Sequence, residues 1–174
     1  METALAALII ITLILVGVLT LAQGYLVANE QMAMAWRSME ERAGDRARTG
    51  LQAVGACAVD GGEIVELTVR NSGSTKLSDL SDWDVMLQYG TSEVLCTRWF
   101  PYVATEPGDN QWSMVGIYTD AERRTPEQLD PGILNPGEEM VLRVRVSPAV
   151  SSGTQNEAAV ATPNGVSTAI AFVD

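Results

Sequence analysis

Residues 3–29 read TALAALIIITLILVGVLTLAQGYLVAN and contain no charged residue. A helix rises about 1.5 Å per residue, so these 27 residues would extend over roughly 40 Å, enough to cross the hydrocarbon core of a bilayer with some tilt. The segment therefore spans a membrane or is buried in an equally apolar environment. A cleaved secretory signal fits poorly, because Met1 and Glu2 supply no basic residue and the apolar run is too long. We expect the working protein to keep this helix.

The helical pattern continues from Glu30 to Arg48, where the sequence becomes polar. Apolar residues recur there every three or four positions, which predicts one apolar stripe formed by Met32, Trp36, Met39, Ala43 and Ala47. Two ion pairs are expected beside the stripe, Arg37 with Glu41 and Asp45 with Arg48. A helix of nearly fifty residues is too long to bury itself against a domain of this size, so it must pack against something else.

The helix is expected to end at Thr49 and Gly50, with Gly50 in the left-handed conformation that glycine favours after a helix. Beyond it, apolar and polar residues alternate in short segments separated by glycine, proline and asparagine, which predicts antiparallel strands with one buried face. The candidate strands are residues 53–59, 65–70, 83–89, 94–99, 112–118, 140–146, 157–162 and 166–173.

The expected fold class is α+β. Residues 1–50 form a hydrophobic N-terminal helix, and residues 51–174 form an immunoglobulin-like antiparallel β-sandwich large enough to bury its own core. The two parts also differ in net charge: residues 1–50 have a net charge of −1 and residues 51–174 a net charge of −10, which gives −11 for the whole chain. Such an acidic domain disfavours binding to nucleic acid or to anionic lipid, although a surface charged only for solubility explains the charge equally well.

The sequence offers little catalytic chemistry. Histidine is absent, which excludes Ser-His-Asp and Cys-His arrangements and the usual zinc sites. Lysine occurs once, at Lys76. Three aspartates, Asp79, Asp82 and Asp84, are candidates for a calcium site, but turn formation explains them as well. The pair Glu138 and Glu139 follows a Pro-Gly turn and is expected to be exposed rather than to act as acid and base. We expect neither an enzyme nor a cofactor.

The two cysteines, Cys57 and Cys96, lie in separate predicted strands and fit no zinc or redox motif. In an extracellular domain an even cysteine count predicts a structural disulfide between them. Two buried free thiols are the alternative.

A family resemblance rests on the apolar helix, its amphipathic continuation, and the motifs TGLQAV at residues 49–54, ELTVRNSGS at 66–74 and LSDLS at 77–81. Together they resemble an archaellin, the filament subunit of the archaeal motility organelle in the type IV pilin-like superfamily. The resemblance implies a leader removed by a class III (prepilin-type) signal peptidase, so that Met1 would be the first mature residue. Type IV pilins carry glutamate at the fifth mature position, where this chain has Leu5, which favours an archaellin over a pilin. Archaellins commonly carry N-glycans, but no Asn-x-Ser/Thr acceptor occurs here.

Physical reasoning on the helix leads to the same function. A membrane-inserted subunit enters a polymer only if other copies replace the lipid, so identical helices are expected to bundle in a helical filament, with the acidic domains outside. Gly17 and Gly24 would allow close approach of these helices. The residues expected to pack in the filament core are Leu5, Leu8, Ile9, Ile11, Ile14, Leu15, Val18, Leu19, Leu21, Met32, Trp36 and Met39.

The expected protein is thus an extracellular homopolymer for swimming motility, held in the cytoplasmic membrane before assembly and handled by the peptidase and the filament assembly machinery. The alternatives are an anchored minor or envelope-binding β-sandwich protein, an adhesive pilus subunit, an ordinary single-pass anchor and an anchored enzyme.

Overall fold

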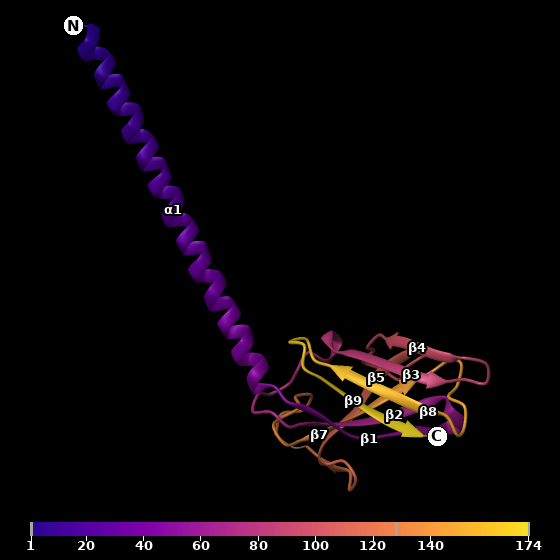
Figure 1. The fold of residues 1–174 in the computed structure, drawn as a ribbon. Helices are drawn as coiled ribbons and strands as arrows, with labels where there is room; N and C mark the ends of the chain where they lie inside the picture. The colour runs from indigo at the N-terminus through magenta and orange to yellow at the C-terminus, as the bar shows by residue number, and fades with distance from the viewer. Residues whose placement is uncertain (1, 128, 174) are drawn as a thin grey trace. The chain divides into compact units, whose positions relative to one another are not determined.

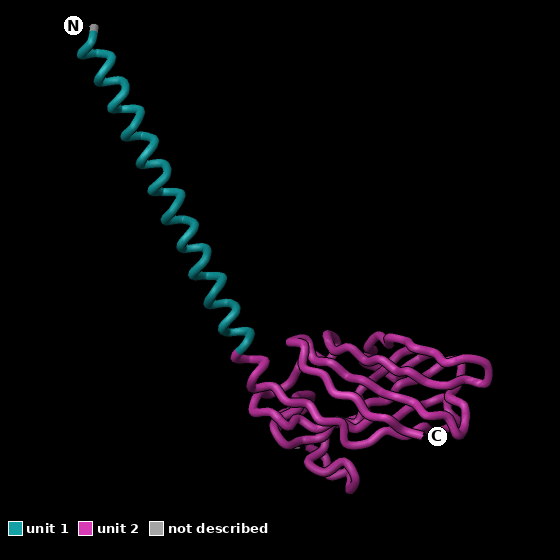
Figure 2. The backbone as a smooth tube through the Cα atoms, in the orientation of Figure 1, with its two compact units in different colours: residues 1–43 teal, residues 44–174 magenta. Residues whose placement is uncertain are grey.

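The computed structural model describes residues 2–127 and 129–173, so the expectation for Met1 as the mature terminus lies outside it. It divides into two compact units, Met1–Ala43 and Gly44–Asp174, coloured separately in Figure 2. The described residues of the first unit belong to one continuous helix, α1 (Glu2–Arg48), as the sequence predicted. Within it the Thr12 and Thr20 hydroxyls each donate to the carbonyl four residues earlier, at 2.8 Å. These internal hydrogen bonds suit the apolar surroundings that the segment requires.

The second unit contains two antiparallel sheets that form a sandwich (Figure 1). In order across the sheet, the five-stranded sheet consists of β1 (Leu51–Val59), β2 (Ile64–Asn71), β7 (Glu139–Arg145), β5 (Gln111–Asp120) and β6 (Thr125–Pro126). The four-stranded sheet consists of β4 (Leu95–Phe100), β3 (Asp84–Gly90), β8 (Gln155–Ala161) and β9 (Ser167–Val173). Short 3-10 turns occupy Asp60–Gly62 and Leu80–Asp82. The predicted strands are confirmed, and β6 is the one described strand that the sequence did not predict.

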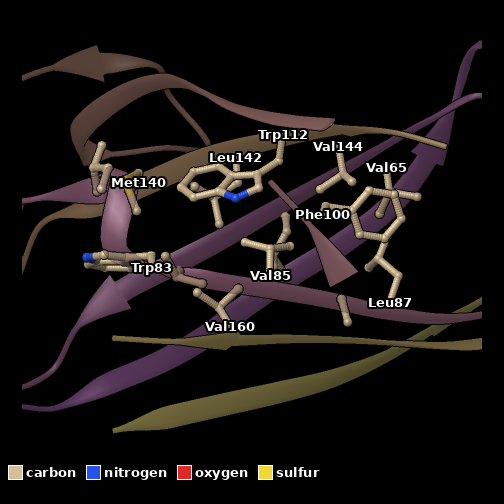
Figure 3. Packing of buried hydrophobic residues seen from close by; sticks show 14 of the residues in the cluster. Val65, Trp83, Val85, Leu87, Phe100, Trp112, Met140, Leu142, Val144 and Val160 are labelled. Carbon is tan, nitrogen blue, oxygen red and sulfur yellow. The ribbon is translucent and has the colours of Figure 1, made fainter. Parts of the chain in front are cut away.

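The core lies between the two sheets (Figure 3). Trp83, Phe100 and Trp112 are its largest apolar side chains and are almost completely buried. Every second residue of the central strands points into it, as the alternation predicted: Val65, Leu67, Val69, Val85, Leu87, Met140, Leu142, Val144, Ala158 and Val160. The β-domain therefore buries a core from its own residues.

The last turn of α1 is hydrogen-bonded into the β-domain. The Ser74 N–H donates to the Arg48 carbonyl at 2.9 Å, and Asn164 donates through its side chain to the buried Thr49 hydroxyl at 2.6 Å. These bonds explain why the second compact unit begins before β1.

Gly50 corrects one prediction, because it does not adopt the left-handed conformation. A Cβ at Gly50 would instead lie 2.6 Å from the Gly73 nitrogen and 2.7 Å from the Ser72 hydroxyl oxygen. Close approach of two backbone segments, rather than a positive φ, therefore requires glycine here.

The acidic pair after the Pro-Gly turn is a second correction, because Glu138 and Glu139 are both buried. Glu138 accepts from the Asn135 backbone N–H at 2.8 Å and so closes its own turn. Glu139 pairs with Arg70 and accepts the Ala121 N–H at 2.9 Å. Both carboxylates are structural because hydrogen bonds satisfy them away from water.

Candidate assembly surface

The apolar residues of α1 form the largest uncovered hydrophobic surface of the described chain. From Leu5 to Val27 its large apolar side chains are between 51% and 76% exposed. They lie on all sides of the helix, since consecutive residues such as Leu13, Ile14 and Leu15 are all uncovered. Relative to water, covering the exposed part of each such side chain contributes about 1–2 kcal/mol. This segment therefore requires lipid or other protein around it.

The described chain contains one helix long and apolar enough to cross a membrane, within Thr3–Arg48. The residues predicted for the filament core between Leu5 and Leu21 all lie in this helix and are all exposed. Their contacts in an assembly remain a prediction.

The polar half of α1 presents a narrower apolar surface. Met32, Trp36 and Met39 are exposed and lie along one side of the helix, because α-helical residues three or four apart share a face. We call the line of Met32, Trp36, Met39, Ala43 and Ala47 the stripe. Met34 is equally exposed but lies on the opposite side, and the sequence analysis did not single it out.

One of the two predicted ion pairs is confirmed. The Arg48 guanidinium lies 2.6 Å from the Asp45 carboxylate. Within the described helix Arg37 and Glu41 do not pair, so that prediction is wrong. Arginine before glutamate is the less favourable order for an i, i+4 pair, which is consistent with this result.

The outer face of the five-stranded sheet is charged. Arg143 lies 2.7 Å from Glu66 and 3.5 Å from Glu106, and its hydrogen bond to Glu66 raises the pKa of the guanidinium. A shallow depression of about 600 Å³ lies beside these groups and also contains Arg70 and Glu139. Arg70 pairs with Glu139 inside this depression, and Glu66 at its edge pairs with Arg143.

The outer face of the four-stranded sheet is nearly free of charge. Strand register places Trp99, Met86, Ala159 and Ala169 directly beside one another in a row across β4, β3, β8 and β9. Trp99 also donates through Nε1 to Asp84 at 2.8 Å. Sequence reasoning missed this surface, although the alternate alanines of β8 and β9 were a signal for it. This row of four uncharged side chains, with Asp84 and Glu157 as the charged residues of the same face, is a candidate contact surface on a domain of net charge −10.

The predicted disulfide is wrong for this structure, because both cysteines are free. Cys57 is paired in register with Glu66, on the outer face of the five-stranded sheet, whereas Cys96 is paired with buried Tyr89 and packs against the core. The Cys57 thiol thus points away from the core and the Cys96 thiol points toward it, on different sheets. Partial burial and, second, the Glu66 carboxylate raise the pKa of the Cys57 thiol.

The three aspartates considered for calcium do not form a site. No group of three or more His, Cys, Asp or Glu side chains suited to a metal ion occurs among residues 2–127 and 129–173. Asp79 precedes the turn before β3 and Asp82 ends it, and each accepts a hydrogen bond from a neighbouring serine. Asp84 accepts a hydrogen bond from Trp99. The alternative interpretation as turn residues agrees with these contacts.

Comparisons with solved structures bear on the fold. FlaG, the archaellum periplasmic stator protein from Sulfolobus acidocaldarius, is 22% identical, with a TM-score of 0.51 over 71% of this chain and 99% of that chain. The archaeal flagellin FlaB1 from Methanocaldococcus jannaschii is 16% identical, with a TM-score of 0.51 over 72% of this chain and 89% of that one. No family model and no curated protein sequence matches the chain.

The archaeal flagellum of Methanospirillum hungatei strain JF1 matches at 14% identity and a TM-score of 0.51, over 97% of this chain and 90% of that chain. The chain shares the fold of archaellum proteins. Because this match covers 97% of the chain, it includes the long helix as well as the β-sandwich. The fold expected from the archaellin resemblance is thereby confirmed, while filament and stator proteins both share it.

Proposed function

We propose that this protein is the repeating subunit of an extracellular helical filament of the archaellum type, used for swimming. The single observation that carries the proposal is the N-terminal helix, which is apolar on every side over 27 residues and exposed throughout. A membrane anchor requires an apolar surface only along the segment that contacts lipid. In this helix the stripe extends the apolar surface into the polar half, which would contact water if no other copy covered it. Contacts with other copies cover both halves.

The proposed assembly exchanges lipid around residues 3–29 for neighbouring helices. Before assembly the subunit lies in the cytoplasmic membrane through this segment, where a prepilin-type peptidase and the assembly machinery act on it. Afterwards the helices form the core and the acidic domains face the medium. The likeness to the Methanospirillum filament over 97% of the chain supports this arrangement.

A second candidate is a membrane-anchored component that works beside a filament. The likeness to FlaG favours it, because the match covers 99% of the solved FlaG chain and 71% of this chain. In this case the row of uncharged side chains formed by Trp99, Met86, Ala159 and Ala169 would bind a neighbour in the cell envelope.

Fractionation of sheared cells separates the two candidates. Extracellular filaments are removed by shearing and pelleted, and the chain is quantified in that pellet and in the membranes. A filament subunit is the dominant protein of the pellet, in a constant amount per unit of filament length. Retention in the membranes, with filaments made of another protein, would reject the first proposal in favour of the second.

A further inference from the structure

The stripe on the polar half of α1 is bordered by opposite charges. Successive helical residues are rotated by about 100°, so positions can be compared with Met32. Glu40 lies about 80° to one side of Met32, whereas Arg42 and Arg46 lie about 80° and 40° to the other side. The remaining charged residues of this segment lie on the far side: Glu30, Arg37, Glu41, Asp45 and Arg48. One border is therefore acidic and the other basic.

These border charges have no partner within the described part of the chain. The one ion pair found within α1 joins Asp45 and Arg48, on the far side from the stripe. Arg42 and Arg46 are four residues apart, so the two like charges lie beside each other and disfavour the isolated helix. An acidic group from outside the helix would relieve this repulsion.

A second copy of the same helix supplies that group only in one orientation. When parallel helices direct their stripes toward a common axis, the acidic border of each lies against the basic border of the next. When neighbours are antiparallel, borders of the same sign meet and repel. Complementary borders on one sequence thus favour parallel neighbours in a repeating, head-to-tail arrangement.

We propose that neighbouring copies of α1 pack in parallel, with Glu40 of one copy against Arg42 and Arg46 of the next. This inference rests on the proposed filament and adds the contact that orients its subunits. Along the axis Glu40 lies about 3 Å from the level of Arg42 and about 9 Å from that of Arg46. A neighbour displaced axially within this range keeps one arginine level with Glu40.

The stripe and its charged borders have different roles in the proposed contact. Exposed ion pairs contribute little to stability, so the apolar stripe supplies most of the attraction and the borders select the orientation. The β-domains, at −10 each, repel one another and offer no such selection.

Charge exchange between two full-length variants tests the inference. One variant carries Glu40→Arg, and the other carries Arg42→Glu with Arg46→Glu. Each is expressed alone, and both are expressed together, in cells without the wild-type gene. A third, single-chain variant carries all three exchanges. Arg37→Glu with Glu41→Arg is the control, because it exchanges two charges on the far side of the helix.

We expect each border variant alone to yield fewer filaments than the wild type, because equal charges then meet at every contact. Together they should form filaments containing equal amounts of both chains, and the triple exchange and the control should assemble like the wild type. Normal assembly of each border variant alone, or failure of both the mixture and the triple exchange to restore it, would overturn the inference. If the wild-type chain itself forms no filaments, the proposed function fails and this inference fails with it.

Discussion

Met32 and Met34 provide a matched test of the stripe. They are the same residue type on the same helix, with 60% and 65% of their surface exposed in the single chain, but they lie on opposite sides. Both are beyond the apolar run, so water is the relevant reference for burial. Complete burial of methionine contributes about 1.5–3 kcal/mol, and the exposed fraction of Met32 leaves about 1–2 kcal/mol to be gained on assembly.

Met32→Ala should therefore cost about 1 kcal/mol per subunit, which corresponds to a roughly fivefold lower association constant. Met34→Ala should cost almost nothing, and the change in helix propensity is the same at both positions. The assay follows the guanidinium concentration at which half of the purified filaments no longer sediment. A midpoint lowered equally by both substitutions, or lowered more by Met34→Ala, would refute the assignment of the stripe to subunit contacts.

Three further predictions concern the β-domain. Gly50→Ala should lower the thermal unfolding midpoint of the β-domain, because a Cβ would lie 2.6 Å from the Gly73 nitrogen. Gly55→Ala, where a Cβ meets nothing within 4 Å, should leave the midpoint nearly unchanged, and equal effects would contradict the close approach at Gly50. Tyr89→Phe should leave stability unchanged or slightly raised, because the buried hydroxyl has no hydrogen-bond partner in the described structure, and a loss above about 1 kcal/mol in chemical denaturation would argue against this. Both cysteines should be alkylated in denatured protein without reductant, and recovery of a linked peptide would contradict the free thiols. In the folded protein Glu66→Gln should speed alkylation of Cys57 near pH 8, because it removes one cause of the raised thiol pKa, and an unchanged rate would contradict this cause.

The strands were predictable because each central strand has one face in the core, so residues such as Val65, Leu67 and Val69 recur with period two. The helix was predictable because 27 consecutive residues without a charge are long enough to span a membrane as a helix. β6 was not, since it has two residues, one of them Pro126, and it forms only as the return of a hairpin.

The side to which Cys57 points could not be predicted from alternation. Ala53 pairs with core residue Val69, so uninterrupted alternation would direct residue 57 inward as well. A β-bulge between Ala53 and Gly55 shifts the register and directs Cys57 outward beside Glu66. Burial of Glu139 was equally hidden, because it depends on contacts with Arg70 and the turn after β5, which are distant in sequence.

The central claim is that residues 3–29 form the core of a polymer, and one substitution tests it most directly. Ile14 lies in the middle of this run and is 60% exposed in the single chain. Ile14→Asp would bury an unpaired carboxylate at every subunit, at a cost of several kcal/mol each, while Ile14→Leu preserves the apolar surface. Electron microscopy of sheared cells should show filaments for the wild type and Ile14→Leu and none for Ile14→Asp, although the latter retains a folded, protease-resistant β-domain. Filaments of normal length from Ile14→Asp subunits would contradict the account.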